Sequence, residues 1–151
     1  MANSRMISRR AFAIGGACAF LAAAAPGWAF ADPDGLGALL RKVLGVESFT
    51  ESRIKLEVPE SAENGLVVPV SVEVDSPMTE ADHVRSLHLF ALDNPVPQVS
   101  SYTFTPANGK AAISTRVRLA KSQDLIAVAE MSDGTVHVAK APVSIMIGGC
   151  G

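Results

Sequence analysis

The sequence predicts an all-β fold, an immunoglobulin-like β-sandwich of about seven or eight strands with a short amphipathic helix before it and a flexible tail after it. From residue 53 onward, apolar and polar residues alternate over short runs, which is the period of half-buried strands. Pro, Gly, Asn, Asp and Ser separate these runs at regular spacing. The 120 residues of 32–151 are enough for one domain with a single core.

Residues 1–31 read as an export signal and not as part of the fold. Arg9 and Arg10 form a twin-arginine pair, an Ala- and Gly-rich apolar run follows, and Ala29-Phe30-Ala31 resembles a cleavage site. The competing interpretation is a membrane anchor, but the apolar run is shorter than the ~20 residues of a spanning helix. We therefore expect export by the twin-arginine pathway to a bacterial periplasm, with no membrane segment in the mature chain.

Removal of this signal changes the charge and the cysteine content. Three of the 13 basic residues and none of the 15 acidic ones lie in it, so the mature chain carries a net charge of −5. A net acidic domain without basic runs argues against binding to nucleic acid or to anionic membranes. Cys18 leaves with the signal, so Cys150 is the one cysteine of the mature protein.

The first element of the predicted domain, residues 32–147, is a helix within residues 35–45. Five apolar residues fall on one face at helical spacing: Leu36, Leu39, Leu40, Val43 and Leu44. Gly45 is a typical stop. We expect this helix to cover the edge of a sheet, although packing on a partner stays open.

Eight runs with strand character follow: 53–58, 66–74, 84–92, 99–105, 111–120, 124–131, 135–140 and 143–147. Pro69 within the second run indicates an edge position or a bulge there. Asp133-Gly134 is a strong signal for a hairpin turn. In the run 84–92 both faces are apolar, so this strand needs two covers, and one of them is either this chain or another subunit.

The body of the domain offers little chemistry. His83, His88 and His137 lack metal-ligand spacing and are expected to be solvated, and no cofactor or metal site is predicted. A copper site built from three methionines is a weaker alternative to their packing in or near the core: Met78, Met131 and Met146.

The tail is different, because Gly148, Gly149, Cys150 and Gly151 follow the last residue with a packing role, Ile147. Glycines let a backbone pivot and enter a narrow channel. Four residues reach about 14 Å, far enough to deliver a thiol into a buried site of another protein. No activating cation or histidine is placed beside Cys150, and the terminal carboxylate disfavours its thiolate. The pattern predicts a carrier whose thiol is activated by the enzymes it visits.

Other roles for this cysteine remain open at this point. An exposed odd cysteine also suits an intermolecular disulfide, and the protein would then be a periplasmic structural or interaction sandwich that dimerises through Cys150. Prenylation is excluded because no C-a-a-X box is present.

These features resemble the SoxY family, the sulfur carriers of the periplasmic thiosulfate-oxidising Sox system. The resemblance covers the twin-arginine signal, the segments "VPVSVEVDSPMTEADHV", "LDNPVPQV" and "FTPANGKAAISTRVRLAKSQDLIAVAEMSDG", and the tail "IGGCG". The family pattern usually ends in two glycines after the cysteine, whereas this chain has one, Gly151, which leaves open how the tip seats in its enzymes.

The resemblance implies a carrier without turnover of its own, joined to a SoxZ-like subunit as a heterodimer. It further implies that thiosulfate is attached to Cys150 by the haem protein SoxAX and that SoxB releases sulfate. In systems with the molybdenum and haem enzyme SoxCD, that enzyme oxidises the remaining sulfur.

Overall fold

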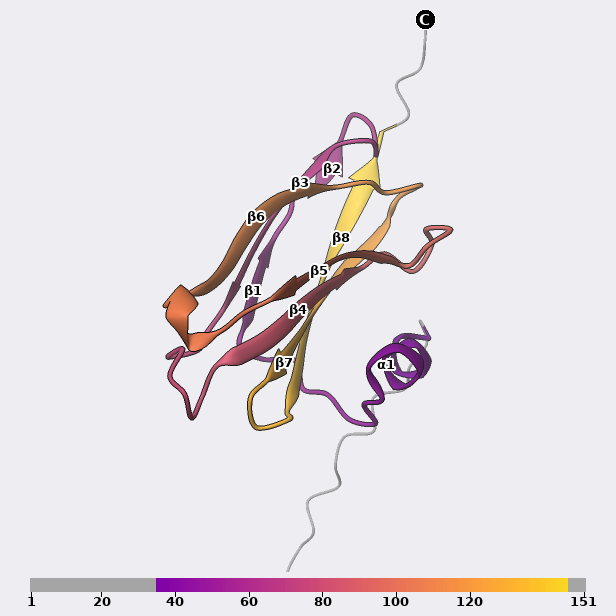
Figure 1. The fold of residues 1–151 in the computed structure, drawn as a ribbon. Coiled ribbons are helices and arrows are strands. Elements are labelled where there is room, and N and C mark those ends of the chain that lie inside the picture. The colour runs from indigo at the N-terminus through magenta and orange to yellow at the C-terminus, as the bar shows by residue number, and fades with distance from the viewer. Residues whose placement is uncertain (1–34, 147–151) are drawn as a thin grey trace, which may run out of the picture. The chain divides into compact units, whose positions relative to one another are not determined.

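The computed structural model describes residues 35–146, which form eight strands, one α-helix and one 3-10 turn. Figure 1 shows how these elements are arranged. The elements are α1 (Leu36–Leu44), β1 (Ile54–Glu57), β2 (Ser61–Ala62), β3 (Val68–Val74), β4 (Val84–Phe90), β5 (Gln98–Thr103), η1 (Pro106–Asn108), β6 (Ala111–Val117), β7 (Gln123–Met131) and β8 (Val136–Ile145). The predicted all-β, immunoglobulin-like class and its seven or eight strands are confirmed.

The strands form two sheets that face each other (Figure 1). One sheet has three strands in the order β1-β3-β6, and the other has five in the order β2-β8-β7-β4-β5. All neighbours are antiparallel except β2, which pairs with the end of β8 in parallel. Both β5 and β6 are edge strands, linked through η1.

Apolar side chains at alternate positions fill the space between the sheets. β3 shows the alternation most clearly, with buried valines separated by Pro69, Ser71 and Glu73. Because successive side chains of a strand point to opposite faces, every second residue reaches the core. The fully or nearly fully buried members on β3, β4 and β7 are Val68, Val70, Val72, Val74, Val84, Leu87, Leu89, Leu125, Ala127, Ala129 and Met131.

A second, smaller core lies between α1 and the outer face of the five-stranded sheet. Figure 1 shows the helix on this side of the sandwich. Leu36 and Leu40 of the helix are fully buried against Phe90, Ile126 and neighbouring valines. The helix therefore covers a face of the sheet and not an edge, which corrects the expectation for residues 35–45. Strand 84–92 thus receives its second cover from its own chain.

The helix ends as predicted, but one of its five apolar residues does not pack. Gly45 adopts a left-handed conformation, φ 69°, and donates its N–H to the carbonyl of Arg41. A residue with a Cβ is disfavoured in that conformation, which explains the glycine. Val43, predicted on the buried face, is exposed, because the sheet covers less of the helix surface than the apolar spacing indicates.

The runs 135–140 and 143–147, predicted as two strands, belong to the single strand β8, which ends at Ile145. Pro142 does not interrupt it. The N–H groups of Val138 and Ser144 point to the outer edge of β8, toward Thr50 and Glu60. Since N–H directions alternate along a strand, the missing N–H of Pro142 falls on this edge and removes no bond to β7. Ile147 lies outside the described residues.

The β7–β8 turn and Pro69 agree with the sequence predictions, whereas β2 was not predicted. Asp133-Gly134 makes the β7–β8 hairpin, with Gly134 at φ 84°. Pro69 lies where β3 extends beyond the end of β1, so β3 has only β6 beside it there, as an edge position requires. β2, in contrast, falls in a segment read as a loop, because two residues are too few to show a period.

Candidate functional site

The residues that the sequence singles out for function lie outside the described part of the chain. They are Cys150, Gly148, Gly149 and Gly151 of the tail and Arg9 and Arg10 of the export signal. The structure does describe the end of the sandwich from which the tail continues. Its last described residue is Met146, four positions before Cys150.

Backbone hydrogen bonds hold the end of β8 beside β2. The Ser144 N–H donates to the carbonyl of Glu60 at 2.9 Å, and the Met146 N–H donates to the carbonyl of Ala62 at 2.8 Å. These bonds continue the parallel pairing of β2 one residue beyond the strand. The chain is therefore fixed up to the point where the carboxyl-terminal segment begins.

A second set of contacts connects this end to the β6–β7 loop, residues 118–122. The Ser122 hydroxyl accepts the N–H of Ile145 at 2.8 Å, and the Leu119 N–H donates to the carbonyl of Gly65 at 2.8 Å. Gly65 lies so close to Leu119 that a Cβ built on it would meet the Leu119 carbonyl oxygen at 1.9 Å. The β2–β3 loop thus packs backbone to backbone against the β6–β7 loop.

The β4–β5 loop joins the same assembly through Asn94. Its side-chain amide donates to the carbonyl of Arg118 at 2.8 Å and accepts the N–H of Ala120 at 2.8 Å. It also accepts from the side chain of Gln123 at 3.0 Å. Three loops and the end of β8 therefore form one hydrogen-bonded end of the sandwich.

This end carries most of the large apolar side chains that are exposed in residues 35–146. Leu66 is 60% exposed, Val67 57%, Met146 54% and Val96 69%, whereas Val43 on α1 is 42% exposed. Single exposed apolar residues are ordinary, but a group of them on neighbouring loops often marks an interaction surface.

An open groove of about 300 Å³ lies at this end, and Val67 contributes to its lining. Pro59, Ala62, Val67 and Pro69 supply its apolar lining, together with polar residues of the β2–β3 loop. Sequence reasoning missed the surface because Leu66 and Val67 lead directly into an alternating run and read as part of that strand. Gly65, directly before this run, was the available signal, because a glycine within a strand pattern often marks a close approach of two backbones.

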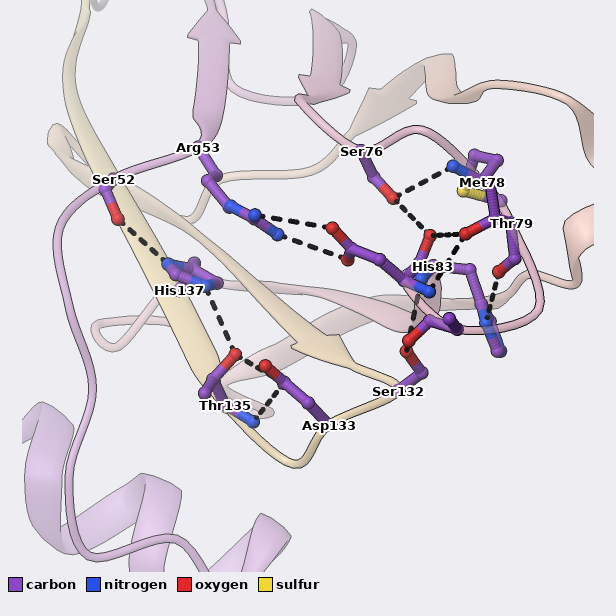
Figure 2. A network of polar contacts seen from close by, with 12 residues as sticks. Ser52, Arg53, Ser76, Met78, Thr79, His83, Ser132, Asp133, Thr135 and His137 are labelled. Carbon is purple, nitrogen blue, oxygen red and sulfur yellow. Dashed lines mark hydrogen bonds and ion pairs between the residues drawn. The ribbon is translucent and has the colours of Figure 1, made fainter.

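The opposite end of the sandwich holds a polar network, shown in Figure 2. The guanidinium of Arg53 contacts the carboxylate of Asp82 at 3.3 and 3.4 Å. The Ser132 hydroxyl accepts the N–H of His83 at 3.1 Å, and the His83 ring bonds to the carbonyl of Thr79 at 3.0 Å. These hydrogen bonds join the segment before β1, the β3–β4 loop and the β7–β8 turn, so the network holds the three segments together.

His137 and Asp133 complete this network (Figure 2). His137 Nδ1 lies 2.9 Å from the Ser52 hydroxyl, and burial, followed by the nearby Arg53 cation, lowers the pKa of His137. Hydrogen bonds from the side chain and backbone of Thr135 lower the pKa of Asp133. The carboxylate is thereby held ionised at the turn, where it acts as a cap.

His88 departs from the expectation of a solvated residue, since it is only 9% exposed. Its Nε2 lies 3.1 Å from the Ser86 hydroxyl, which donates to Glu130 at 2.6 Å, and its Nδ1 lies 2.9 Å from the Ser101 hydroxyl. Burial lowers the pKa of His88. The ring is therefore a neutral member of a polar cluster on the outer face of the sheet, next to Phe90.

The three methionines divide between core and surface. Met78 and Met131 are buried, as predicted, whereas Met146 is exposed beside the tail. Within residues 35–146, no three His, Cys, Asp or Glu side chains are gathered closely enough to hold a metal ion. None of the helices in that range has the length and apolar character needed to cross a lipid bilayer.

The family model described as "Sulfur oxidation protein SoxY" matches residues 40–150, a range that ends at the tail cysteine. No curated protein matches the chain significantly in sequence.

Solved structures give a consistent result. The sulfur carrier protein SoxY from Chlorobium limicola f thiosulfatophilum is 29% identical, with a TM-score of 0.62 over 73% of this chain and 90% of that one. The superoxide reductase (neelaredoxin) from Ignicoccus hospitalis is 20% identical, with a TM-score of 0.54 over 62% of this chain and 80% of that one. The superoxide reductase from Nanoarchaeum equitans is 11% identical, with a TM-score of 0.53 over 63% of this chain and 99% of that one. The likeness to the two reductases is one of fold alone.

Proposed function

Because this chain belongs to the SoxY family, we propose that it is a covalent sulfur carrier of periplasmic thiosulfate oxidation that holds intermediates on Cys150. The family match over residues 40–150 is the observation that carries this proposal, and the solved SoxY sulfur carrier adds to it. Membership supports a carrier role in sulfur oxidation and not a catalytic one. The attachment of sulfur at Cys150 is the finer part of the proposal.

The architecture of the described residues supports a carrier at this end of the chain. Backbone bonds fix Met146 to β2, and Cys150 follows four residues later. Four extended residues span at most about 14 Å, so the thiol works within that distance of the sandwich. The glycines around Cys150 leave its approach to a narrow active site unhindered by side chains.

The chemistry consists of four steps on a group that stays attached to the Cys150 sulfur until the last of them. The Cys150 thiol and thiosulfate join as Cys–S–S–SO₃⁻, releasing one proton and two electrons to a SoxAX-like haem protein. A SoxB-like hydrolase then adds water and releases sulfate and two protons, which leaves Cys–S–S⁻. Where a SoxCD-like enzyme acts, the outer sulfur takes up three water oxygens, gives six electrons and six protons, and becomes Cys–S–SO₃⁻. A second hydrolysis releases sulfate and restores the thiolate.

The carrier works as a heterodimer with a SoxZ-like subunit, and export by the twin-arginine route delivers both to the periplasm. That route transports folded proteins, so a subunit without its own signal can travel bound to this chain. Arg9 and Arg10 are the residues on which this export depends.

Intact-mass spectrometry tests the carrier role. The mature chain and its SoxZ-like partner are incubated with thiosulfate and a SoxAX-like protein under oxidising conditions. We expect a mass gain equal to S₂O₃, which is thiosulfuric acid minus two hydrogen atoms. The gain should be reversed by reductant and absent in Cys150→Ser. A chain that gains only the mass of a second copy, with thiosulfate oxidation unaffected by Cys150→Ser, would instead establish the disulfide-linked interaction protein.

A further inference from the structure

The loops at the tail end of the sandwich present an apolar surface that has no part in the chemistry proposed for Cys150. We define the exit rim as Leu66, Val67 and Met146. All three are more than half exposed, and Val96 extends the apolar character on the neighbouring β4–β5 loop. We propose that the exit rim is the surface on which enzymes acting on Cys150 dock, a proposal that rests on the proposed function.

The rim is held in place by backbone contacts on both sides. Met146 is bonded to Ala62, and the loop that carries Leu66 and Val67 is bonded through Gly65 to Leu119. A surface already fixed before binding loses less conformational entropy when a partner orders it. Exposed apolar residues on fixed backbone are therefore suited to contact, whereas the same residues on a loose loop would contribute less.

The length of the tail identifies the occupant. Cys150 lies four residues beyond Met146, so its sulfur reaches at most about 14 Å from the rim. An enzyme that encloses the thiol in an active site at the bottom of a channel must bring the mouth of that channel to within this distance. The exit rim lies at the end of the sandwich from which the tail continues, so it is the part of the sandwich that the mouth meets.

The size of the rim favours a transient enzyme over a permanent subunit. Permanent partners usually bury large apolar interfaces, whereas three or four side chains suit an encounter that must end after each step. A subunit seated permanently on the rim would also block the approach to the tail. The expected partner surface is thus an apolar collar around a channel that admits the glycine-flanked thiol.

Replacement of rim residues by glutamate tests the proposal with full-length mature carrier in complex with its SoxZ-like subunit. Leu66→Glu and Val67→Glu place a charge on the rim, and Val43→Glu on α1 is a matched control, since Val43 is also an exposed apolar residue but lies on the helix. Sulfate release by the purified SoxB-like hydrolase is measured with each loaded carrier. A loaded synthetic peptide of residues 147–151, which lacks the rim, is measured beside them.

We expect each rim variant to lower kcat/KM about tenfold through KM, with kcat retained, because docking and not chemistry is impaired. Val43→Glu retains wild-type kcat/KM, and the peptide gives the low value of the rim variants. Rim variants with wild-type kcat/KM would overturn the docking proposal and leave the carrier role intact. Loss of the SoxZ-like subunit from the rim variants, seen by native mass spectrometry, would overturn it as well and assign the rim to that subunit. A wild-type carrier that cannot be loaded at all would contradict the proposed function itself.

Discussion

Gly65 is the residue at which a single methyl group most directly tests the architecture of the tail end. An ideal Cβ on Gly65 would lie 1.9 Å from the carbonyl oxygen of Leu119 and 3.1 Å from its carbonyl carbon. Both contacts are with backbone, so no side chain can rotate away. Gly65→Ala must therefore separate the β2–β3 loop from the β6–β7 loop by more than 1 Å, roughly the shortfall from ordinary contact distance.

The magnitude follows from two losses. Separation on that scale breaks the 2.8 Å bond from the Leu119 N–H to the Gly65 carbonyl, which contributes about 1 kcal/mol. Displacement of packed backbone adds about 1–3 kcal/mol, the usual range for an inserted methyl group. We expect Gly65→Ala to lower the free energy of unfolding by about 2–4 kcal/mol, or Tm by roughly 10 °C for a domain of this size.

Urea and thermal unfolding of the mature chain measure this loss, with Gly109→Ala as the matched control. Gly109 has φ 69° and no atom within 4 Å of the point where a Cβ would lie, so alanine there meets backbone strain without a clash. That strain amounts to about 1 kcal/mol. Gly65→Ala with wild-type stability, or with a loss no larger than that of Gly109→Ala, would refute the close approach of the two loops.

Two further predictions concern the outer face of the five-stranded sheet. Leu40→Ala removes a fully buried side chain between α1 and the sheet and should destabilise the chain by about 2–4 kcal/mol in urea, whereas Val43→Ala on the same helix should change little. Burial holds the pKa of His88 below its ordinary value of 6.5, so the unfolded chain binds a proton more readily than the folded chain as the pH falls below 6.5. The urea concentration at the unfolding midpoint should therefore decrease as the pH is lowered from 7.5 to 5.5, and His88→Gln should make that decrease smaller. His137, whose pKa is also lowered, contributes a decrease in the same direction. An unchanged pH dependence in His88→Gln would contradict the neutral, buried ring.

The period of the sequence was enough to predict the fold class because the strands of the three-stranded sheet bury one face and expose the other. In β6 the expected alternation is present, with Val117 buried and Ser114 and Arg116 exposed. Period alone could not join the runs 135–140 and 143–147, because Pro142 looks like a break. Whether a proline interrupts a strand depends on which edge its missing N–H faces, and that is a property of the assembled sheet.

The polar residues were harder to place than the apolar ones. His88 lies in an apolar strand, and its neighbours Ser86 and Ser101 come from two different strands. Only the register of β4 and β5 brings them together, and burial of the imidazole follows from that register. The sequence shows the residue type but not which strand lies beside it. Solvation was therefore the wrong expectation for His88.

The tail drew attention in the sequence because its composition is extreme, yet the surface around its base did not. The residues that build this end come from four segments: the β2–β3, β4–β5 and β6–β7 loops and the end of β8. Asn94 and Ser122 are ordinary loop residues in sequence, and their role as connectors depends on backbone groups more than twenty residues away. Such contacts follow from topology and have no local signature.

The other surfaces of the described sandwich are less suited to transient apolar contact. The outer face of the three-stranded sheet carries opposite charges at close range, Lys55 with Glu57 at 2.7 Å and Lys110 with Glu73 at 3.0 Å. All four side chains are at least half exposed, which is the behaviour of a solvated face. The outer face of the other sheet is covered by α1 or occupied by the satisfied cluster around His88. In the proposed carrier role, an enzyme that acts on Cys150 would therefore meet large apolar side chains first at the exit rim, which lies within reach of the short tail.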